Sequence, residues 1–261
     1  MLLTVMKPIV KSLLRKYDLR IYNIPKTKLT GFEFWNDLKL IVGKDDPVCL
    51  DVGANRGQTI TELERLFLAP RIFAFEPSTV SFARLSEEFR RPNIQLYRYG
   101  LGSALEQREF INYESSTLSS FLELSSNGGN RFRNVQVSNR EIVEVKTVDW
   151  FVSQEQLQVV DLLKIDTQGY DLEVLKGAAG SLASGIIKTV LLELNFIEMY
   201  EKQGSVHEIE DFLANFNYHL VDYYGKSRLG NTIAWCNGIY CPRPASYVPQ
   251  TEKEHAPKVA V

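Results

Sequence analysis

A short apolar stretch that ends in an acidic residue and a glycine-rich turn constrains this chain more than any other feature of its sequence. The apolar run that begins at Pro47 reads as a buried parallel strand that stops at Asp51, and the turn that follows contains Gly53 and Gly57. Glycine permits positive φ and a close approach of the backbone to a ligand. A helix predicted to begin near Gln58 would present unpaired N–H groups and the positive end of its dipole to the same place. The sequence therefore predicts a strand-turn-helix site for a polar ligand.

A second acidic residue, Glu76, follows the next predicted strand, residues 71–75. It lies about twenty residues after the glycine-rich turn, the spacing at which an acid accepts the hydroxyl pair of a ribose. The turn has no third glycine, as a G-x-G-x-x-G dinucleotide motif requires, and no Lys-Ser/Thr pair, as a phosphate-binding loop requires. These features favour a nucleoside without a pyrophosphate. They argue against the alternative of an NAD-linked oxidoreductase or epimerase.

Two later predicted strands, 159–165 and 188–194, bring further carboxyl groups to the same edge of the sheet. Asp166 directly follows the first strand, and Glu193 lies near the end of the second. Open α/β sheets bind their ligands at the carboxyl ends of the strands, next to the switch point of the topology. We therefore expect Asp166 to face the chemistry. Paired with Glu193, one carboxyl group would raise the pKa of the other towards that of a general base.

Two basic residues are weaker candidates for a role in catalysis. Lys164 stands within an otherwise apolar strand. Burial of an unpaired ammonium costs several kcal/mol, so a carboxylate partner such as Asp166 or Glu193 is implied, whether the lysine serves catalysis or only a structural ion pair. His207, near the start of a later helix, is an alternative base, although a surface position is the simpler interpretation.

Three motifs in this order resemble the FkbM family of methyltransferases. They are Asp51-Val52-Gly53-Ala54-Asn55-Arg56-Gly57, Phe75-Glu76-Pro77, and Leu163-Lys164-Ile165-Asp166-Thr167-Gln168-Gly169-Tyr170-Asp171. The resemblance implies a Rossmann-like class I methyltransferase: an α/β fold with a seven-stranded, mostly parallel sheet, an antiparallel last strand, and helices on both faces. It also implies S-adenosylmethionine as the cofactor and O-methylation as the reaction.

The resemblance also suggests roles for individual residues. Residues 51–57 would hold the methionine part of the cofactor, Glu76 the ribose, and the turn at residues 100–103 the adenine. The residues expected to bind the cofactor are Asp51, Gly53, Asn55, Gly57, Thr59, Glu76, Pro77, Leu101 and Gly102. Those expected to act in catalysis are Asp166, Lys164 and Glu193. The family often has Glu where this chain has Gln168 and Asp171, which puts a role for either position in doubt.

Composition excludes several other classes of protein. The chain has 261 residues, 44% of them hydrophobic and 24% charged, which is typical of one globular α/β domain with additions. A net charge of −2 gives no general attraction to nucleic acid. Three scattered cysteines and three scattered histidines form neither a disulfide framework nor a metal site. Without a membrane-spanning apolar run or a cleavable signal, we expect a cytoplasmic enzyme.

The chain divides into three predicted parts. Residues 1–46 form a helical extension or cap, residues 47–242 the methyltransferase domain, and residues 243–261, rich in proline and charge, a flexible tail. Residues 2–17 have the pattern of a basic amphipathic helix. Such a helix either covers the domain or contacts a membrane surface through residues 1–20, and the first interpretation is the simpler one.

The polar stretch 114–139 is predicted to be a loop that contacts the substrate. It is rich in Ser, Asn and Gly, and its run Ser115-Ser116-Thr117-Leu118-Ser119 resembles one found in FkbM-like chains. A surface insertion is the alternative. Taken together, the sequence predicts O-methylation of a hydroxyl on a sugar, glycoconjugate or secondary metabolite. Magnesium-assisted transfer and a catalytically silent nucleoside-binding module are the alternatives that remain.

Overall fold

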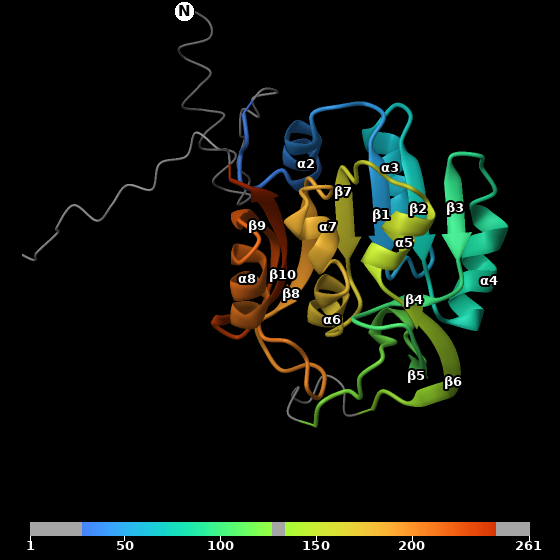
Figure 1. Cartoon of the computed structure of the whole chain (residues 1–261). Coiled ribbons are helices and arrows are strands. Elements are labelled where there is room, and N and C mark those ends of the chain that lie inside the picture. Colours follow the sequence, from blue (N-terminus) through green and yellow to red (C-terminus); the bar gives the residue numbers. More distant parts are fainter. Residues whose placement is uncertain (1–27, 127–133, 244–261) are drawn as a thin grey trace, which may run out of the picture.

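The computed structural model describes residues 28–126 and 134–243, which form an α/β domain around a seven-stranded sheet (Figure 1). The strands lie in the order β3-β2-β1-β7-β8-β10-β9. Their bounds are β1 Val48–Val52, β2 Arg71–Phe75, β3 Ile94–Tyr97, β7 Leu162–Ile165, β8 Val190–Asn195, β9 Tyr218–Leu229 and β10 Thr232–Pro242. β10 runs antiparallel to both of its neighbours, and the other paired strands are parallel. The predicted class I methyltransferase architecture is confirmed.

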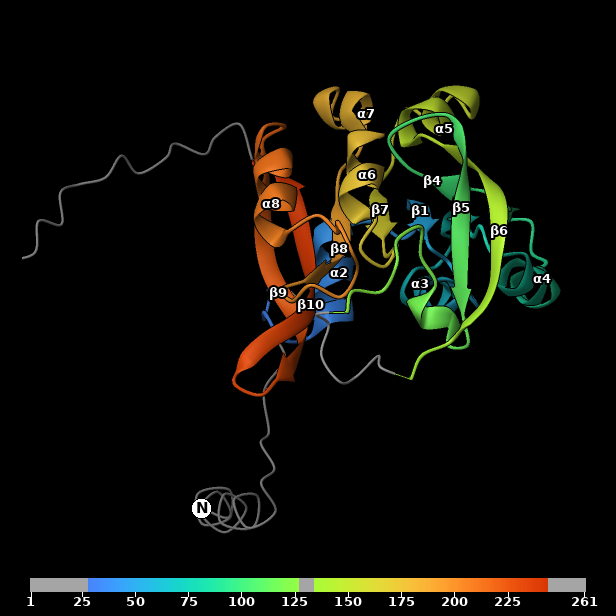
Figure 2. The same ribbon diagram turned by 90° about the horizontal axis from the view of Figure 1, so that it is seen from below.

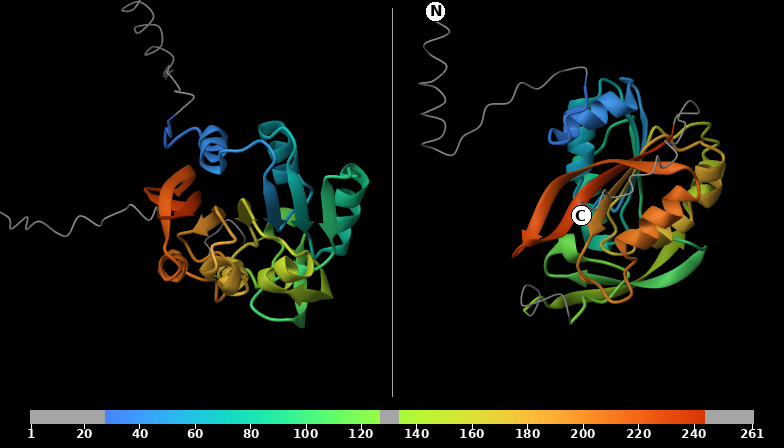
Figure 3. Two further views of the ribbon diagram at one scale, coloured as in Figure 1. Left: turned by 45° about the horizontal axis from the view of Figure 1, so that its top comes forward. Right: turned by 90° about the vertical axis from the view of Figure 1, so that its left-hand side faces the viewer.

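Helices cover both faces of the sheet, as Figure 3 shows in side view. On one face pack α2 (Phe34–Val42), α3 (Gln58–Leu66) and α4 (Thr79–Glu88). On the other pack α5 (Val148–Gln154), α6 (Asp171–Lys176), α7 (Ala179–Ala183) and α8 (Val206–Ala214). Because both faces are covered, the central strands are apolar along most of their length, which is why they could be recognised in the sequence.

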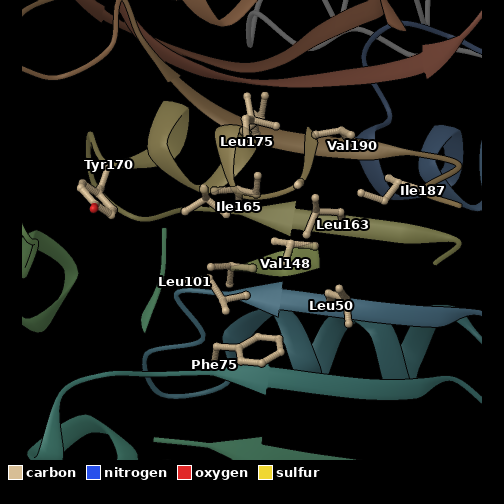
Figure 4. Close-up of a cluster of buried hydrophobic side chains, with 14 of the residues drawn as sticks. Leu50, Phe75, Leu101, Val148, Leu163, Ile165, Tyr170, Leu175, Ile187 and Val190 are labelled. Atoms are coloured by element: carbon tan, nitrogen blue, oxygen red, sulfur yellow. The ribbon is translucent and has the colours of Figure 1, made fainter. Parts of the chain in front are cut away.

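Two apolar layers hold the sheet between its helices. Figure 4 shows the larger one, in which Leu50, Leu163 and Val190 from three neighbouring strands meet Val148 and Leu175 from the helices. The other layer includes Leu38 of α2, Ile60 of α3 and Leu85 of α4, all fully buried. The part of the N-terminal extension that is described, residues 28–46, therefore packs on the sheet through α2.

A second, three-stranded sheet was not predicted as such. It consists of β4 (Gly100–Leu101), β6 (Val137–Lys146) and β5 (Glu106–Tyr113), in that order. Figures 1 and 2 show it beyond the carboxyl ends of the parallel strands, on the side of β1, β2 and β3. β6 begins at Val137, so it takes in the last residues of the stretch that was expected to be a loop. The small sheet therefore closes the edge at which a ligand would bind.

Side chains at the starts of α4 and α5 cap these two helices. Ser78, a residue type that favours the N-cap and is predicted there from the sequence, caps α4, since its Oγ accepts a hydrogen bond from the Ser81 N–H. The sequence places Asp149 either to cap α5 or to stabilise its N-terminus by charge: the cap is Thr147, which accepts from the Trp150 N–H, and Asp149 is the acidic residue in the first turn. Asp149 also accepts hydrogen bonds from the Gly180 and Ser181 N–H groups at the start of α7, both at 2.7 Å.

No helix in residues 28–126 or 134–243 is long and apolar enough to cross a membrane. The predicted helix at residues 2–17, the membrane contact through residues 1–20 and most of the predicted tail lie outside the described residues. So do residues 127–133, at the centre of the polar stretch.

Candidate active site at the carboxyl ends of the strands

The turn after β1 is shaped by three residues in the left-handed region: Gly53 (φ +80°), Asn55 (φ +48°) and Gly57 (φ +85°). The N–H groups of Gly53 and Ala54 both donate to the carbonyl of Phe75 at 3.0 Å, which ties the turn to β2. A Cβ at Gly53 would lie 2.0 Å from the carbonyl oxygen of Asp166. The two turns that follow β1 and β7 therefore cross at a distance that only glycine allows.

Gly53→Ala is expected to lower the free energy of unfolding by about 2–3 kcal/mol, from the strained φ and the steric clash together. Gly185→Ala is the matched control, because Gly185 also has a positive φ (+67°) but a Cβ added to it would meet no atom within 4 Å. The control should lose only about 1 kcal/mol, the conformational part of the effect. Urea unfolding followed by circular dichroism measures both. Equal losses in the two variants would show that the crossing of the turns adds nothing.

Glu76 lies just beyond β2 with both carboxylate oxygens held by the backbone. Oε2 accepts from the Asn55 N–H at 2.8 Å, and Oε1 accepts from the Ser78 N–H at 2.9 Å. Burial raises the pKa of Glu76 to about 7, although these two N–H groups act in the opposite direction. Each oxygen keeps a lone pair for a further donor, so the carboxylate can accept two hydroxyl groups of a ligand.

Glu76 and Asp166 border a single pocket of about 220 Å³. The pocket has apolar walls from Phe75, Leu101, Phe110 and Phe121. Eight of the predicted site residues line it, namely Gly53, Asn55, Thr59, Glu76, Pro77, Leu101, Lys164 and Asp166. Carboxylates and N–H groups at one end with flat apolar walls nearby are what a nucleoside requires, so these residues fit S-adenosylmethionine.

The other four predicted residues do not line this pocket. Asp51 lies beneath it, fully buried. Gly57 packs against Phe89, and Gly102 packs against Tyr170, at positions where a Cβ would be within 3 Å of an aromatic ring atom. These two glycines therefore shape the turns. The fourth residue, Glu193, contacts Gln168, which does line the pocket.

Lys164 is the charged centre of the site. Its Nζ lies 2.9 Å from Asp51 Oδ1 and 3.8 Å from Asp166 Oδ2, and it donates to the carbonyl of Gly53 at 3.1 Å. Burial lowers the pKa of this ammonium, but the carboxylates of Asp51, Asp166 and Glu193 outweigh burial, and the net shift is upward. Lys164 is thus a cation in the folded protein. Its nearest partner is Asp51, which was not among the partners predicted.

Asp51 depends on this lysine. Its carboxyl group is completely buried, and neither oxygen accepts a hydrogen bond from any other group in the described part of the chain. Burial raises the pKa of Asp51, and the Lys164 ammonium opposes that shift. Asp51 therefore acts on the cofactor turn indirectly, by fixing the lysine that binds Gly53.

Gln168 joins Asp166 and Glu193, the two carboxyl groups that were predicted to meet. Its Nε2 donates to Asp166 Oδ1 at 2.7 Å and to Glu193 Oε1 at 3.3 Å. Its Oε1 lies 2.9 Å from the hydroxyl of the buried Tyr200. Burial and the charges of Asp166 and Asp171 raise the pKa of Glu193 to about 8. Asp166 and Glu193 therefore form a pair, and the Gln168 amide bridges their two carboxyl groups.

The stretch after β5 covers the pocket and also contacts Gln168. Ser116, Thr117 and Ser119 line the pocket, the first two in a short 3-10 helix, Ser116–Leu118. Ser120 Oγ donates to the Gln168 carbonyl at 2.7 Å. Neither Tyr200 nor these serines were among the predicted site residues, although the run 115–119 had been noted as a substrate loop.

His207 is exposed in the first turn of α8 and lines a separate hollow with Glu210 and Tyr223. It does not border the pocket of Glu76 and Asp166, so the interpretation as a surface residue agrees with the structure. Over the two described ranges, 28–126 and 134–243, no group of three or more His, Cys, Asp or Glu side chains is placed to hold a metal ion.

The fold and the site together define a class I methyltransferase that uses S-adenosylmethionine. The Methyltransferase FkbM domain matches residues 51–220, and the chain belongs to this family. A crystal structure of Methyltransferase FkbM from Methylobacillus flagellatus has the same fold, with a TM-score of 0.52 and 14% identity over 76% of this chain and 44% of that chain. The predictions of family, enzyme class and cofactor are confirmed.

Two curated relatives are methyltransferases with named activities. The Hexuronic acid methyltransferase AglP of Haloferax volcanii is 31% identical over 162 residues, which are 60% of this chain and 60% of AglP. The 2-O-methyltransferase NoeI of Sinorhizobium fredii is 25% identical over 183 residues, 67% of this chain and 74% of NoeI. The match to AglP thus spans less than two thirds of that protein.

Proposed function

We propose that this protein transfers a methyl group from S-adenosylmethionine to a hydroxyl of a sugar or glycoconjugate. The observation that carries the proposal is the single pocket bordered by Glu76, suited to a ribose, and by Asp166, suited to a base. The names of AglP and NoeI support a sugar-type acceptor, because one refers to a hexuronic acid and the other to a 2-O position. A hydroxyl of a secondary metabolite is the less supported acceptor.

The residues of the pocket would have different roles in binding and catalysis. Gly53, Asn55 and Thr59 would hold the methionine part of the cofactor, Glu76 and Pro77 the ribose, and Leu101 the adenine. When bound, S-adenosylmethionine supplies an electrophilic methyl group. Asp166 would accept the proton of the acceptor hydroxyl, and general base catalysis of this kind contributes about 10²- to 10⁴-fold to the rate. Lys164 would fix the cofactor turn through Gly53 and Asp51.

Glu76→Gln is expected to weaken S-adenosylmethionine binding about tenfold, because hydrogen bonds to a charged group are stronger than those to a neutral amide. Isothermal titration calorimetry measures the change, with Glu87→Gln on the exposed side of α4 as the matched control.

The same variant also tests the role of the Glu76 charge. Glu76 has a pKa near 7, and only its ionised form accepts both hydroxyls, so wild-type affinity should fall about tenfold between pH 8 and pH 6. Glu76→Gln should show no such fall. A pH dependence that persists in the variant would assign it to another group.

The acceptor is tested by incubating the full chain with S-adenosylmethionine labelled in its methyl group. A panel of free uronic acids, hexoses and short oligosaccharides is offered, and labelled products are separated by mass. Transfer to a sugar hydroxyl supports the proposal. Cofactor binding without transfer to any acceptor would favour a silent module, and failure to bind the cofactor would exclude an enzymatic role.

We also propose the predicted domain limits, with the catalytic domain at residues 47–242 between an N-terminal extension and a C-terminal tail. The match of the family to residues 51–220 supports these limits, and the packing of Leu38 in α2 against the sheet supports the extension as a cap. Limited proteolysis followed by mass spectrometry of the stable fragment tests both boundaries. Stable fragments that end well inside 47–242 would contradict them.

A further inference from the structure

We propose that Gln168 is a positioning residue that places the single negative charge of the Asp166–Glu193 pair on Asp166, the carboxylate that receives the acceptor proton. The inference rests on the proposed function, because the proton comes from the acceptor hydroxyl. The chemistry of methyl transfer does not by itself require a residue such as Gln168, so the inference gives this residue a new role. Three features carry it: the direction of the hydrogen bonds, the charges around the pair, and the backbone of Gln168.

The hydrogen bonds fix the orientation of the Gln168 amide. Its Nε2 carries two hydrogens and faces two carboxyl oxygens, Asp166 Oδ1 and Glu193 Oε1. Rotating the amide would place its carbonyl oxygen 2.7 Å from Asp166 Oδ1, where a carboxylate has no hydrogen to offer. Since the bond to Asp166 is shorter than the bond to Glu193, 2.7 Å against 3.3 Å, the amide stabilises charge on Asp166 more strongly.

The surrounding charges favour the same distribution. Lys164, on β7, faces Asp166, and Asp51, on β1, contacts Lys164. Asp171, at the start of α6, and the hydroxyl of Tyr200 face the pair from the other side. Four carboxyl groups around one ammonium cannot all be ionised without a large repulsion. Lys164 lies 3.8 Å from Asp166, and the pKa of Glu193 is raised to about 8, so Glu193 keeps its proton at neutral pH.

The backbone holds Gln168 in a conformation that is uncommon for a residue with a side chain. Its φ is +55°, and the next residue, Gly169, has φ +88°. Asp171 accepts hydrogen bonds from the N–H groups of Thr167 and Gly169, at 3.0 and 3.1 Å, and Ser120 Oγ donates to the carbonyl of Gln168. Left-handed residues of this kind persist only where the surrounding structure fixes them, and they gather at functional sites. The turn thus directs the amide between the two carboxyl groups.

The proton and charge balance of the reaction fits this arrangement. As the bond between the acceptor oxygen and the methyl carbon forms, the bond from that carbon to sulfur breaks and its electron pair stays on sulfur. The acceptor proton passes to Asp166. One positive and one negative charge are therefore lost together, and the net charge of the site is unchanged, provided that Glu193 is neutral throughout.

Titration of the two carboxyl groups tests the charge distribution without an acceptor. In full-length protein labelled with ¹³C at the side-chain carboxyls, the signals are assigned by their loss in Asp166→Asn and in Glu193→Gln. Of these two carboxyl groups, we expect Glu193, whose pKa is about 8, to be the one that titrates between pH 7 and pH 9. Gln168→Leu should raise its midpoint by about one pH unit, because the Gln168 hydrogen bond that lowers the pKa of Glu193 is removed. A group titrating in this range that proves to be Asp166 would overturn the proposal.

Kinetics of methyl transfer then separate positioning from folding. We expect Gln168→Leu to lower kcat about tenfold or more, to move the acid limb of the pH profile to higher pH, and to leave KM for S-adenosylmethionine within about twofold. Gln156→Leu is the matched control, because Gln156 also has a positive φ (+51°) and lies outside the pocket. A lower kcat with an unmoved pH profile, or an equal effect of Gln156→Leu, would show that Gln168 acts only on the fold. Failure of the proposed function itself appears separately, as absence of transfer by the wild type.

Discussion

Lys164→Met is expected to lower the free energy of unfolding by about 3–5 kcal/mol, the usual effect of removing one member of a buried ion pair. The reason is that the substitution leaves the buried carboxyl group of Asp51 without its partner. That carboxyl group is fully buried, lies 2.9 Å from the lysine, and has no other donor among the described residues. The variant also loses the hydrogen bond to Gly53, so we expect its binding of S-adenosylmethionine to be lost with its stability.

The pH dependence of this variant tests the mechanism. Without Lys164, burial raises the folded-state pKa of Asp51 well above the unfolded-state value of about 3.9. The folded variant then binds more protons than the unfolded chain, so it gains stability as the pH falls. Urea unfolding at pH 8 and at pH 5 should therefore show a larger deficit relative to wild type at pH 8.

Two further variants make the measurement decisive. Lys39→Met removes an exposed lysine that lies 3.7 Å from Asp45, with side chains 49% and 64% exposed, and should lose less than about 1 kcal/mol. The double variant Asp51→Asn with Lys164→Met removes both buried charges and should recover part of the stability. If Lys164→Met loses no more than Lys39→Met, Asp51 has a partner other than Lys164.

The fold could be predicted because it depends on patterns along the chain. Strands covered on both faces appear as apolar runs such as residues 48–50 and 190–192, and the turns that follow β1 and β7 are marked by Gly53, Gly57 and Gly169. Glu76 and Asp166 were placed at one edge of the sheet because parallel strands share their carboxyl ends. The rule of strand direction was enough to bring these two residues to the same pocket.

The partner of Lys164 could not be predicted in the same way. Asp51 and Lys164 lie directly opposite each other in the pairing of β1 with β7, and this register is a property of the folded sheet. The sequence shows only that both residues lie in apolar strands. Asp166 and Glu193 were preferred as partners because their positions at strand ends marked them as site residues. The structure gives them a weaker contact with the lysine than Asp51 has.

Gln168 and Tyr200 were missed for a related reason. Their roles depend on side chains from two separate turns that meet above Asp166, and no spacing in the sequence encodes that meeting. The available signal was Gln168 itself, a polar residue that immediately precedes a glycine after a buried strand. The small sheet is visible in the sequence only as strand pieces at 108–113 and 141–145, because β6 begins with an exposed run, from Val137 to Arg140, that resembles a loop.

Asp166→Asn is expected to lower kcat for methyl transfer about 10²- to 10⁴-fold, because it removes the carboxylate that we propose as the acceptor of the hydroxyl proton. Asparagine keeps the shape of the side chain and an oxygen that can accept the hydrogen bond from Gln168 Nε2. The turn after β7 is also held by Asp171, so the fold should be unchanged. We therefore expect binding of S-adenosylhomocysteine to stay within about threefold of wild type, as measured by calorimetry.

The comparison with Glu193→Gln decides which carboxyl group is the base. A protonated Glu193 resembles glutamine in charge and shape, so this variant should lose less than about tenfold in kcat, while Asp166→Asn loses far more. If Glu193 were the catalytic base, Glu193→Gln would lose more kcat than Asp166→Asn. Equal losses in both variants would mean that the two carboxyl groups share the proton as one unit, and that the Gln168 amide does not distinguish between them. The ratio of the two rates therefore measures the asymmetry that the 2.7 Å and 3.3 Å hydrogen bonds impose.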